Sequence, residues 1–181
     1  MDILDIVIQT CIPPDWQGVN SSNVTRQDYV SNRYRLFELS TNSVEYSREM
    51  EVFREGDLYG RVTKVQRVQN PFQLGRLLLR QEQKKNRNEI VNEVKYYHPL
   101  TNETQLQTAL EYNMDVRRYG NKDYRQGDRD PRFYRTPKEA FDSITTCQYI
   151  LMCVVLSTGE YESFTRQNDT EYMPVYVVKL V

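Results

Sequence analysis

The residues that could do chemistry in this sequence are few. His98 is the only histidine, and it could be joined at a metal only by the three cysteines, Cys11, Cys147 and Cys153. The sequence contains no GxSxG nucleophile motif, no GxGxxG or GxxxxGK phosphate loop and no Cys/His spacing typical of zinc. We therefore expect no metal site. His98 is the single candidate for acid–base or ligand chemistry, and a plain structural role at the end of a strand is an equal alternative.

A second candidate is the segment 117–135, which carries six Arg and one Lys against three Asp and interleaves them with aromatic residues. Basic groups beside aromatic rings suit single-stranded nucleic acid, through phosphate contacts and base stacking. The candidate nucleic-acid residues are Arg117, Arg118, Tyr119, Arg125, Arg129 and Arg132. The plainer alternative is a solvated loop with internal Arg–Asp pairs, and a basic helix face at Arg76, Arg80, Lys84, Lys85 and Arg87 has the same alternative.

The stretch 62–98 must position His98, and its pattern predicts a strand, a capped helix and a second strand. Alternating valines over 62–68 indicate the first strand. Asn70 is a suitable N-cap and Pro71 suits the first helical position. Leu74, Leu77 and Leu78 then form one apolar side of the helix.

Shorter signals predict the other elements. Strands are expected at 35–39, 149–156, 161–165 and 175–181, with the very apolar 149–156 in the centre of the sheet and 161–165 paired back on it as a hairpin. Helices are expected from Ser43 to Gly56, at 105–112 and at 137–141. Trp16 is interpreted as a core or lid aromatic. The fold class is α+β with a largely antiparallel sheet, in a single domain 1–181.

Composition limits the function classes. Twenty-four basic and 25 acidic residues give a formal net charge of -1, so no global field attracts nucleic acid or membrane. An apolar fraction of 39% with 14 tyrosines indicates a folded chain. Three cysteines do not make a disulfide framework, and neither a signal peptide nor a membrane span is evident. We expect a reduced, intracellular protein, nuclear or cytoplasmic.

An ordered set of local patterns resembles the catalytic domain of the poly(ADP-ribose) polymerase (PARP) family, in particular its mono-ADP-ribosyltransferase branch. The most specific match is VTKVQRVQNPF at 62–72. NEVKYYH (92–98), MDVRRYG (114–120), YILMCVVLSTGEY (149–161) and YMPVYVV (172–178) are similar to later family segments, and IPPDW and LFELSTNSVEYSREMEVF to earlier ones. The resemblance covers most of the chain.

The resemblance implies a split antiparallel sheet with flanking helices, in which NAD lies in a groove and is held by a His-Tyr-Glu triad. Carried over by position, the triad is His98, Tyr134 and Val175, and Phe141 is the possible second stacking residue. Pro99 stands where the family has a glycine that offers its backbone to the nicotinamide, and proline has no N–H to donate. The chain between Phe164 and Tyr172 is shorter than in the family.

The parts that differ from the family are those that would touch NAD, so the resemblance implies a catalytically inactive pseudoenzyme without a cofactor. Its expected role is a protein-interaction or scaffold module, within an RNA-binding or chromatin-silencing assembly, with homodimerisation or strand addition at a sheet edge as ways to bind. We expect the groove beside His98 to be filled by Tyr96, Tyr134 or the loop after Arg117. The alternatives are an active NAD-dependent mono-ADP-ribosyltransferase and a single-stranded nucleic-acid binder that uses loop 117–135.

Overall fold

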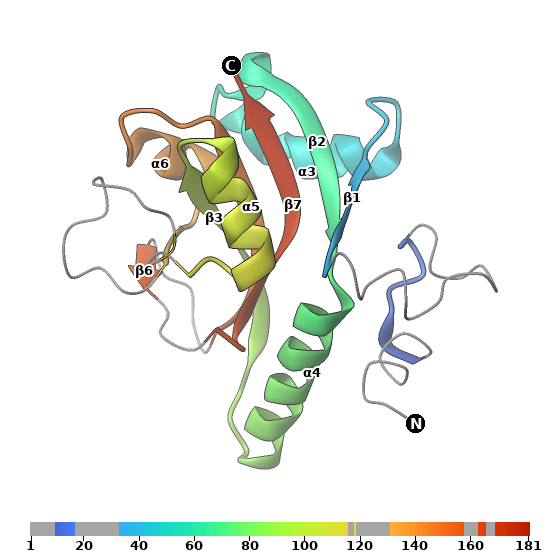
Figure 1. Cartoon of the computed structure of the whole chain (residues 1–181). Helices are drawn as coiled ribbons and strands as arrows, with labels where there is room; N and C mark the ends of the chain where they lie inside the picture. The colour runs from blue at the N-terminus through green and yellow to red at the C-terminus, as the bar shows by residue number, and fades with distance from the viewer. Residues whose placement is uncertain (1–9, 17–32, 116–117, 119–130, 158–162, 166–168) are drawn as a thin grey trace.

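The fold is built on one seven-stranded antiparallel sheet flanked by helices (Figure 1). The computed structural model describes residues 10–16, 33–115, 118, 131–157, 163–165 and 169–181. The strands are β1 (Arg35–Glu38), β2 (Val62–Gln69), β3 (Asn92–Leu100), β4 (Arg132–Tyr134), β5 (Tyr149–Ser157), β6 (Ser163–Thr165) and β7 (Tyr172–Leu180), in the order β1-β2-β7-β5-β3-β4-β6. The helices are α3 (Val44–Glu55), η2 (Tyr59–Arg61), α4 (Pro71–Asn86), α5 (Glu103–Tyr112) and α6 (Pro137–Asp142). The α+β class and the antiparallel sheet expected from the sequence are confirmed.

The apolar strand β5 lies in the middle of the sheet, as predicted. It pairs with β3 over its whole length and with β7 on its other edge. Val155 stands opposite Val94 and Tyr172 and is fully buried. A strand covered on both faces and both edges needs apolar side chains at nearly every position, which explains the continuous run.

The prediction that 161–165 pairs back on the central strand is wrong. The strand there, β6, pairs with β4, where Phe133 stands opposite Phe164. A strand has only two edges for hydrogen bonding, and β3 and β7 already occupy both edges of β5. The short strand is therefore placed at the outer end of the sheet.

Local capping chemistry sets the helix boundaries where the sequence predicted them. The Ser43 hydroxyl accepts a hydrogen bond from the backbone N–H of Tyr46 at 3.1 Å, and helix α3 ends at Gly56. The Asn70 side chain accepts from the backbone N–H of Gln73 at 3.1 Å, with Pro71 as the first residue of α4. Each contact satisfies one of the donors that a helix start leaves unpaired.

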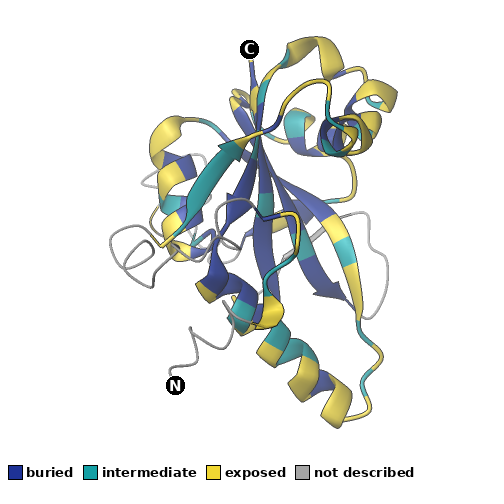
Figure 2. Ribbon diagram, turned by 90° about the vertical axis from the view of Figure 1, so that its right-hand side faces the viewer, coloured by how far each residue is buried: buried dark blue, intermediate teal, exposed yellow. Residues whose placement is uncertain are grey.

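The two faces of the sheet have separate hydrophobic clusters. Helix α5 covers one face and packs Leu106 and Leu110 with Tyr96 of β3. Helices α3 and α6 cover the other face, where Phe53 meets Tyr97 edge-on at 6.2 Å between ring centroids. Figure 2 shows the buried strands between helices whose outer sides are exposed. These two faces decide which candidate residues can act together.

A third cluster lies where α4 meets the ends of β5 and β7. Trp16 is buried there with Leu74 and Leu77 of α4 and with Met173 of β7. The interpretation of Trp16 as a core aromatic is confirmed. The apolar side of α4 therefore holds the segment 10–16 against the sheet.

Candidate functional site

His98 is enclosed in the protein interior, where the ring of Phe133 lies beside it. Tyr134, one of the residues expected to fill this space, packs on the opposite face, and residues 119–130 of the loop after Arg117 lie outside the described residues. The side chain of His98 is 1% exposed, and the Phe133 ring centroid lies 6.0 Å from the imidazole. The imidazole Nδ1 lies 2.8 Å from the backbone oxygen of Arg132. A carbonyl can only accept, so Nδ1 carries the proton and donates it. His98 thereby ties β3 to β4, two strands whose register includes the pair Tyr97 and Tyr134.

The environment of His98 keeps the imidazole neutral. Burial lowers its pKa from 6.5 to about 4, although the hydrogen bond to the Arg132 carbonyl favours the protonated form. A buried imidazolium would lose its hydration, and this cost outweighs the hydrogen bond to the Arg132 carbonyl. At neutral pH, His98 is a hydrogen-bond donor within the fold.

The structure places His98 and Tyr134 on opposite faces of the sheet. Side chains alternate along a strand, and Tyr96 and Leu100, on either side of His98 in β3, belong to the cluster under α5. Tyr134 packs against the cluster under α3 and α6. Phe141 packs against that same cluster, with the Arg61 guanidinium 5.2 Å from its ring centroid. Tyr134 and Phe141 are thus brought together, and His98 is separated from both.

Pro99 and Val175, the other two positions implied by the resemblance, are both apolar and lie in the sheet. Pro99 is buried in β3 opposite Ile150, where its nitrogen has no hydrogen to donate. Val175 is partly buried in β7 and lines a cavity of about 250 Å³ together with Trp16 and Tyr176. Neither residue offers a polar side-chain atom to a ligand.

The cavity beside Val175 is bordered by an ion-pair network that the sequence did not predict. Arg67 of β2 makes two charge-assisted hydrogen bonds to Glu45 of α3, and the Tyr176 hydroxyl donates to Glu45 at 2.8 Å. Burial alone would raise the pKa of the Glu45 carboxyl, but the bonds from Arg67 and Tyr176 lower it below its ordinary value. Glu49, almost fully buried, is bonded to Lys95. The network joins α3 to three strands and is a stabilising element.

The buried cysteines are unsuited to nucleophilic chemistry. Burial raises the pKa of the Cys147 thiol to about 12 and that of Cys153 well above its ordinary value. A thiol is a nucleophile only as the thiolate, which these pKa values disfavour at neutral pH. All three cysteines are free, and Cys11 is exposed.

Only part of the Arg/Tyr segment falls within the described residues. Arg117, Tyr119, Arg125 and Arg129 lie outside them. The Arg118 guanidinium lies 4.2 Å from the centroid of the Tyr112 ring and 3.4 Å from the carboxylate of Asp115. Arg132 is an exposed residue of β4.

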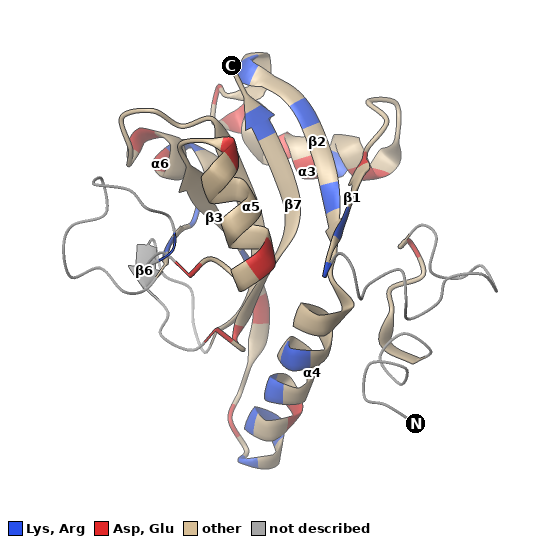
Figure 3. Ribbon diagram, viewed as in Figure 1, with Lys and Arg blue, Asp and Glu red and all other residues tan. Residues whose placement is uncertain are grey.

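Figure 3 shows the Lys and Arg positions that recur along α4. Ion pairs hold part of this basic side against the rest of the protein. Arg80 donates two hydrogen bonds to the buried carboxylate of Glu171, at 3.0 and 2.8 Å, and Lys84 lies 3.2 Å from the same oxygen. Arg76 pairs with Asp169 at 2.7 Å. The internal ion pairs of the plainer alternative are thus present at Arg80 and Lys84, whose shared partner Glu171 directly precedes β7.

Removal of the Glu171 charge should destabilise the fold clearly. We expect Glu171→Gln to lower the free energy of unfolding by about 2 kcal/mol, since Arg80 would lose its carboxylate partner and the buried Lys84 would keep only Glu89, at 3.1 Å. Urea unfolding followed by circular dichroism measures the change. Glu82→Gln on the same helix is the matched control, because Glu82 pairs with Lys85 in an exposed position and should change stability by less than about 0.5 kcal/mol. Equal effects of the two variants would contradict this role for Glu171.

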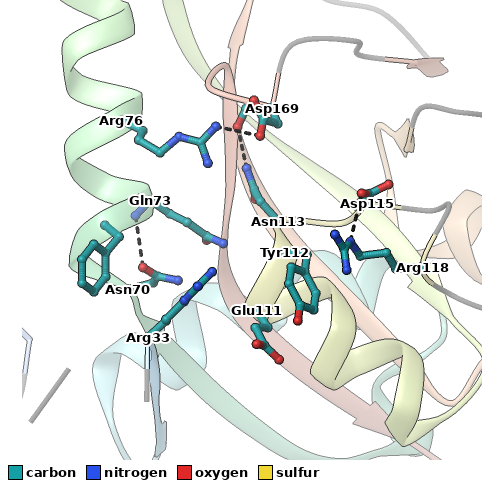
Figure 4. A pocket seen from close by; sticks show the side chains of 11 residues that line it. Arg33, Asn70, Gln73, Arg76, Glu111, Tyr112, Asn113, Asp115, Arg118 and Asp169 are labelled. Atoms are coloured by element: carbon teal, nitrogen blue, oxygen red, sulfur yellow. Dashed lines mark hydrogen bonds and ion pairs between the residues drawn. The ribbon is translucent and has the colours of Figure 1, made fainter. Parts of the chain in front are cut away.

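The larger of the two cavities described is away from His98, between the start of α4 and the end of α5 (Figure 4). Its volume is about 520 Å³, within the roughly 300–1,000 Å³ common for ligand pockets. It is lined by Arg33, Asn70, Phe72, Gln73, Arg76, Glu111, Tyr112, Asn113, Asp115, Arg118 and Asp169. None of the triad positions implied by the resemblance lines it.

Two amide side chains hold this cavity together. Gln73 reaches from α4 and donates from Nε2 to the backbone oxygen of Leu110 at 3.2 Å. Asn113 ends α5 in a left-handed conformation, with φ 51°, and donates from Nδ2 to the backbone oxygens of Asp169 and Tyr172 at 2.6 and 3.0 Å. Within the described part of the chain, Gln73 Oε1 and Asn113 Oδ1 are buried and accept no hydrogen bond.

Sequence reasoning missed this cavity. The cap Asn70-Pro71 fixes Gln73 as the third helical residue, yet nothing local indicates that the end of α5 meets it. The nearest signal was the composition of segment 117–135, which is rich in Arg and aromatic residues. Of the candidate residues named there, only Arg118 lines the cavity.

The described residues contain neither a membrane-spanning helix nor a group of metal ligands. No helix in the described ranges has the length and apolar character needed to cross a membrane. Among the same residues, no three His, Cys, Asp or Glu side chains are grouped so as to hold a metal ion. No protein-family model matches the sequence, and no curated protein matches it.

Proposed function

We propose that the chain is a catalytically inactive domain of the ADP-ribosyltransferase type that acts by binding a protein partner. The state of His98 is the observation that supports this most strongly. Its Nδ1–H donates a hydrogen bond to the Arg132 carbonyl, and its side chain is 1% exposed. The Nδ1 proton is therefore not available to the ribose of a dinucleotide, and the buried ring leaves little surface for such a ligand to contact.

Two further observations support the proposal. Pro99 lacks the backbone donor that would hold a carboxamide, and Val175 lacks a carboxylate. Tyr134 and Phe141 lie on the face opposite His98, so no single groove unites the three. We place the protein inside the cell, in the nucleus or the cytoplasm, in an RNA-binding or chromatin-silencing assembly. Edge strand β1 offers one route for strand addition or homodimerisation.

Titration with NAD tests the loss of the enzymatic function. We expect no transfer of label from radioactive NAD to the chain itself or to added protein, and no saturable heat in isothermal calorimetry beyond that given by AMP alone. Saturable binding in the micromolar range together with labelling would contradict the proposal and favour an active mono-ADP-ribosyltransferase.

A further inference from the structure

We propose that the cavity between α4 and α5 binds the base of a nucleotide with an exocyclic amine, either as a free nucleotide or within single-stranded RNA. The proposal does not rest on the inactive-transferase function. The lining residues include none of His98, Pro99, Tyr134, Phe141 and Val175. The absence of NAD binding at those positions would therefore leave the cavity between α4 and α5 unaffected.

Two side chains that line the cavity, Gln73 and Asn113, each hold a buried acceptor that receives no hydrogen bond within the described part of the chain. The amide nitrogens of Gln73 and Asn113 point to backbone carbonyls, which fixes the orientation of both amides and leaves Gln73 Oε1 and Asn113 Oδ1 as acceptors. Figure 4 shows both side chains between α4 and Tyr112. An unpaired buried acceptor costs roughly 1–3 kcal/mol, which an N–H donor from a ligand would offset after a small side-chain rotation.

The backbone at the end of α5 is also held in an unusual conformation. Asn113 and Met114 both have positive φ, 51° and 59°. Asparagine tolerates the left-handed region, whereas for methionine it costs free energy. Met114 is completely buried and fixes this turn in the core, so the backbone at Asn113 is held in the left-handed conformation.

Aromatic rings at the cavity suit a planar ligand. Tyr112 and Phe72, on α5 and α4, both line it and are both 38% exposed. The Arg118 guanidinium lies 4.2 Å from the centroid of the Tyr112 ring. Stacking of a base on an aromatic side chain contributes about 1–3 kcal/mol.

The charges at the cavity indicate where a phosphate would lie. Arg76 is neutralised by Asp169 at 2.7 Å. Arg33 is exposed and has no ion pair within the described part of the chain, and Arg118 is exposed with its carboxylate partner at 3.4 Å. These two guanidinium groups can contact an anion, while the two amide oxygens require a donor. The exocyclic amine of adenine, cytosine or guanine supplies two N–H groups, one for each amide oxygen, whereas uracil supplies only its single N3–H.

Binding of defined nucleotides tests the proposal. We expect the full chain to bind AMP or CMP at low salt by calorimetry, or fluorescent oligoadenylate by anisotropy, and to bind UMP and oligouridylate at least about tenfold more weakly. Binding of the monophosphate indicates a free nucleotide, and binding of the oligonucleotide alone indicates an RNA strand. Absence of binding to every probe at low salt, or equal binding of adenine and uracil probes, would overturn the proposal.

Substitutions locate the binding in this cavity. Tyr112→Leu should weaken binding about tenfold, and Tyr112→Phe should preserve it, because only the former removes the ring. Gln73→Met removes one buried acceptor and should reduce the preference for adenine over uracil. Tyr59→Leu is the matched control, since Tyr59 is also 38% exposed and carries Arg54 4.5 Å from its ring centroid. Equal loss from Tyr59→Leu and Tyr112→Leu, or full binding by Tyr112→Leu, would place binding elsewhere and overturn the proposal.

Discussion

Val155→Asp should abolish the folded state. Val155 is fully buried in β5 between Val94 and Tyr172, so the new carboxylate would be taken from water without a cation to pair with. The expected loss of at least about 4 kcal/mol is comparable with the whole stability of many domains, roughly 5–15 kcal/mol. Circular dichroism and urea unfolding measure it. Val155→Thr, of the same shape, buries only a hydroxyl and should cost about 1–3 kcal/mol.

The matched control for this substitution is Val44→Asp. Val44 is 84% exposed and is the first residue of α3, where a negative charge interacts favourably with the helix N-terminus. Its effect should be within about 0.5 kcal/mol. A native-like urea midpoint for Val155→Asp would mean that β5 is not the centre of the core.

Acid should destabilise the protein through His98, at pH values where few other groups titrate. The pKa of His98 is about 4 in the folded chain and ordinarily 6.5, so the unfolded chain takes up the proton first as the pH falls. The contribution of the neutral His98 to the free energy of unfolding is fully present above pH 6.5 and is lost progressively as the pH falls to about 4. At about 1.4 kcal/mol for each pKa unit, the loss is about 3 kcal/mol.

His98→Asn isolates this contribution, because the amide nitrogen of Asn can occupy the place of Nδ1 and donate to Arg132 without titrating. Urea unfolding at a series of pH values should give a steeper decrease for the native chain than for the variant. The difference between the two curves should change by about 3 kcal/mol across the window. Glu45, whose pKa is lowered, adds a loss to both curves only below about its ordinary value of 4.5, so it cancels in the difference. Parallel curves from neutral pH to pH 4 would contradict a buried neutral His98.

Much of the fold could be predicted because its signals are local. The caps at Ser43 and Asn70 and the apolar run of β5 each depend on a few neighbouring residues, and each places an element where the structure has it. The partner of β6 is not a local property. Its position depends on β3 and β7 having taken both edges of β5, which no pattern within 161–165 reveals.

The sites were harder to predict than the elements. The sequence does not reveal which side chains of two paired strands lie on the same face of the sheet. In the structure, His98 of β3 and Tyr134 of β4 lie on opposite faces, because side chains alternate along each strand. The partner of the basic residues of α4 could not be predicted, because Glu171 is 91 residues from Arg80. The amide oxygens of Gln73 and Asn113 become a joint feature only when α4 and the end of α5 meet.

Nitrogen-15 NMR of the imidazole is the most direct measurement of the central claim, that His98 is a structural donor and not an NAD ligand. His98 is the only histidine, so its two ring nitrogens give one unambiguous set of signals. We predict a neutral ring with the proton on Nδ1, no titration until the pH nears about 4, and no change on addition of millimolar NAD. Titration near 6.5, or imidazole shifts that saturate with NAD, would contradict this account.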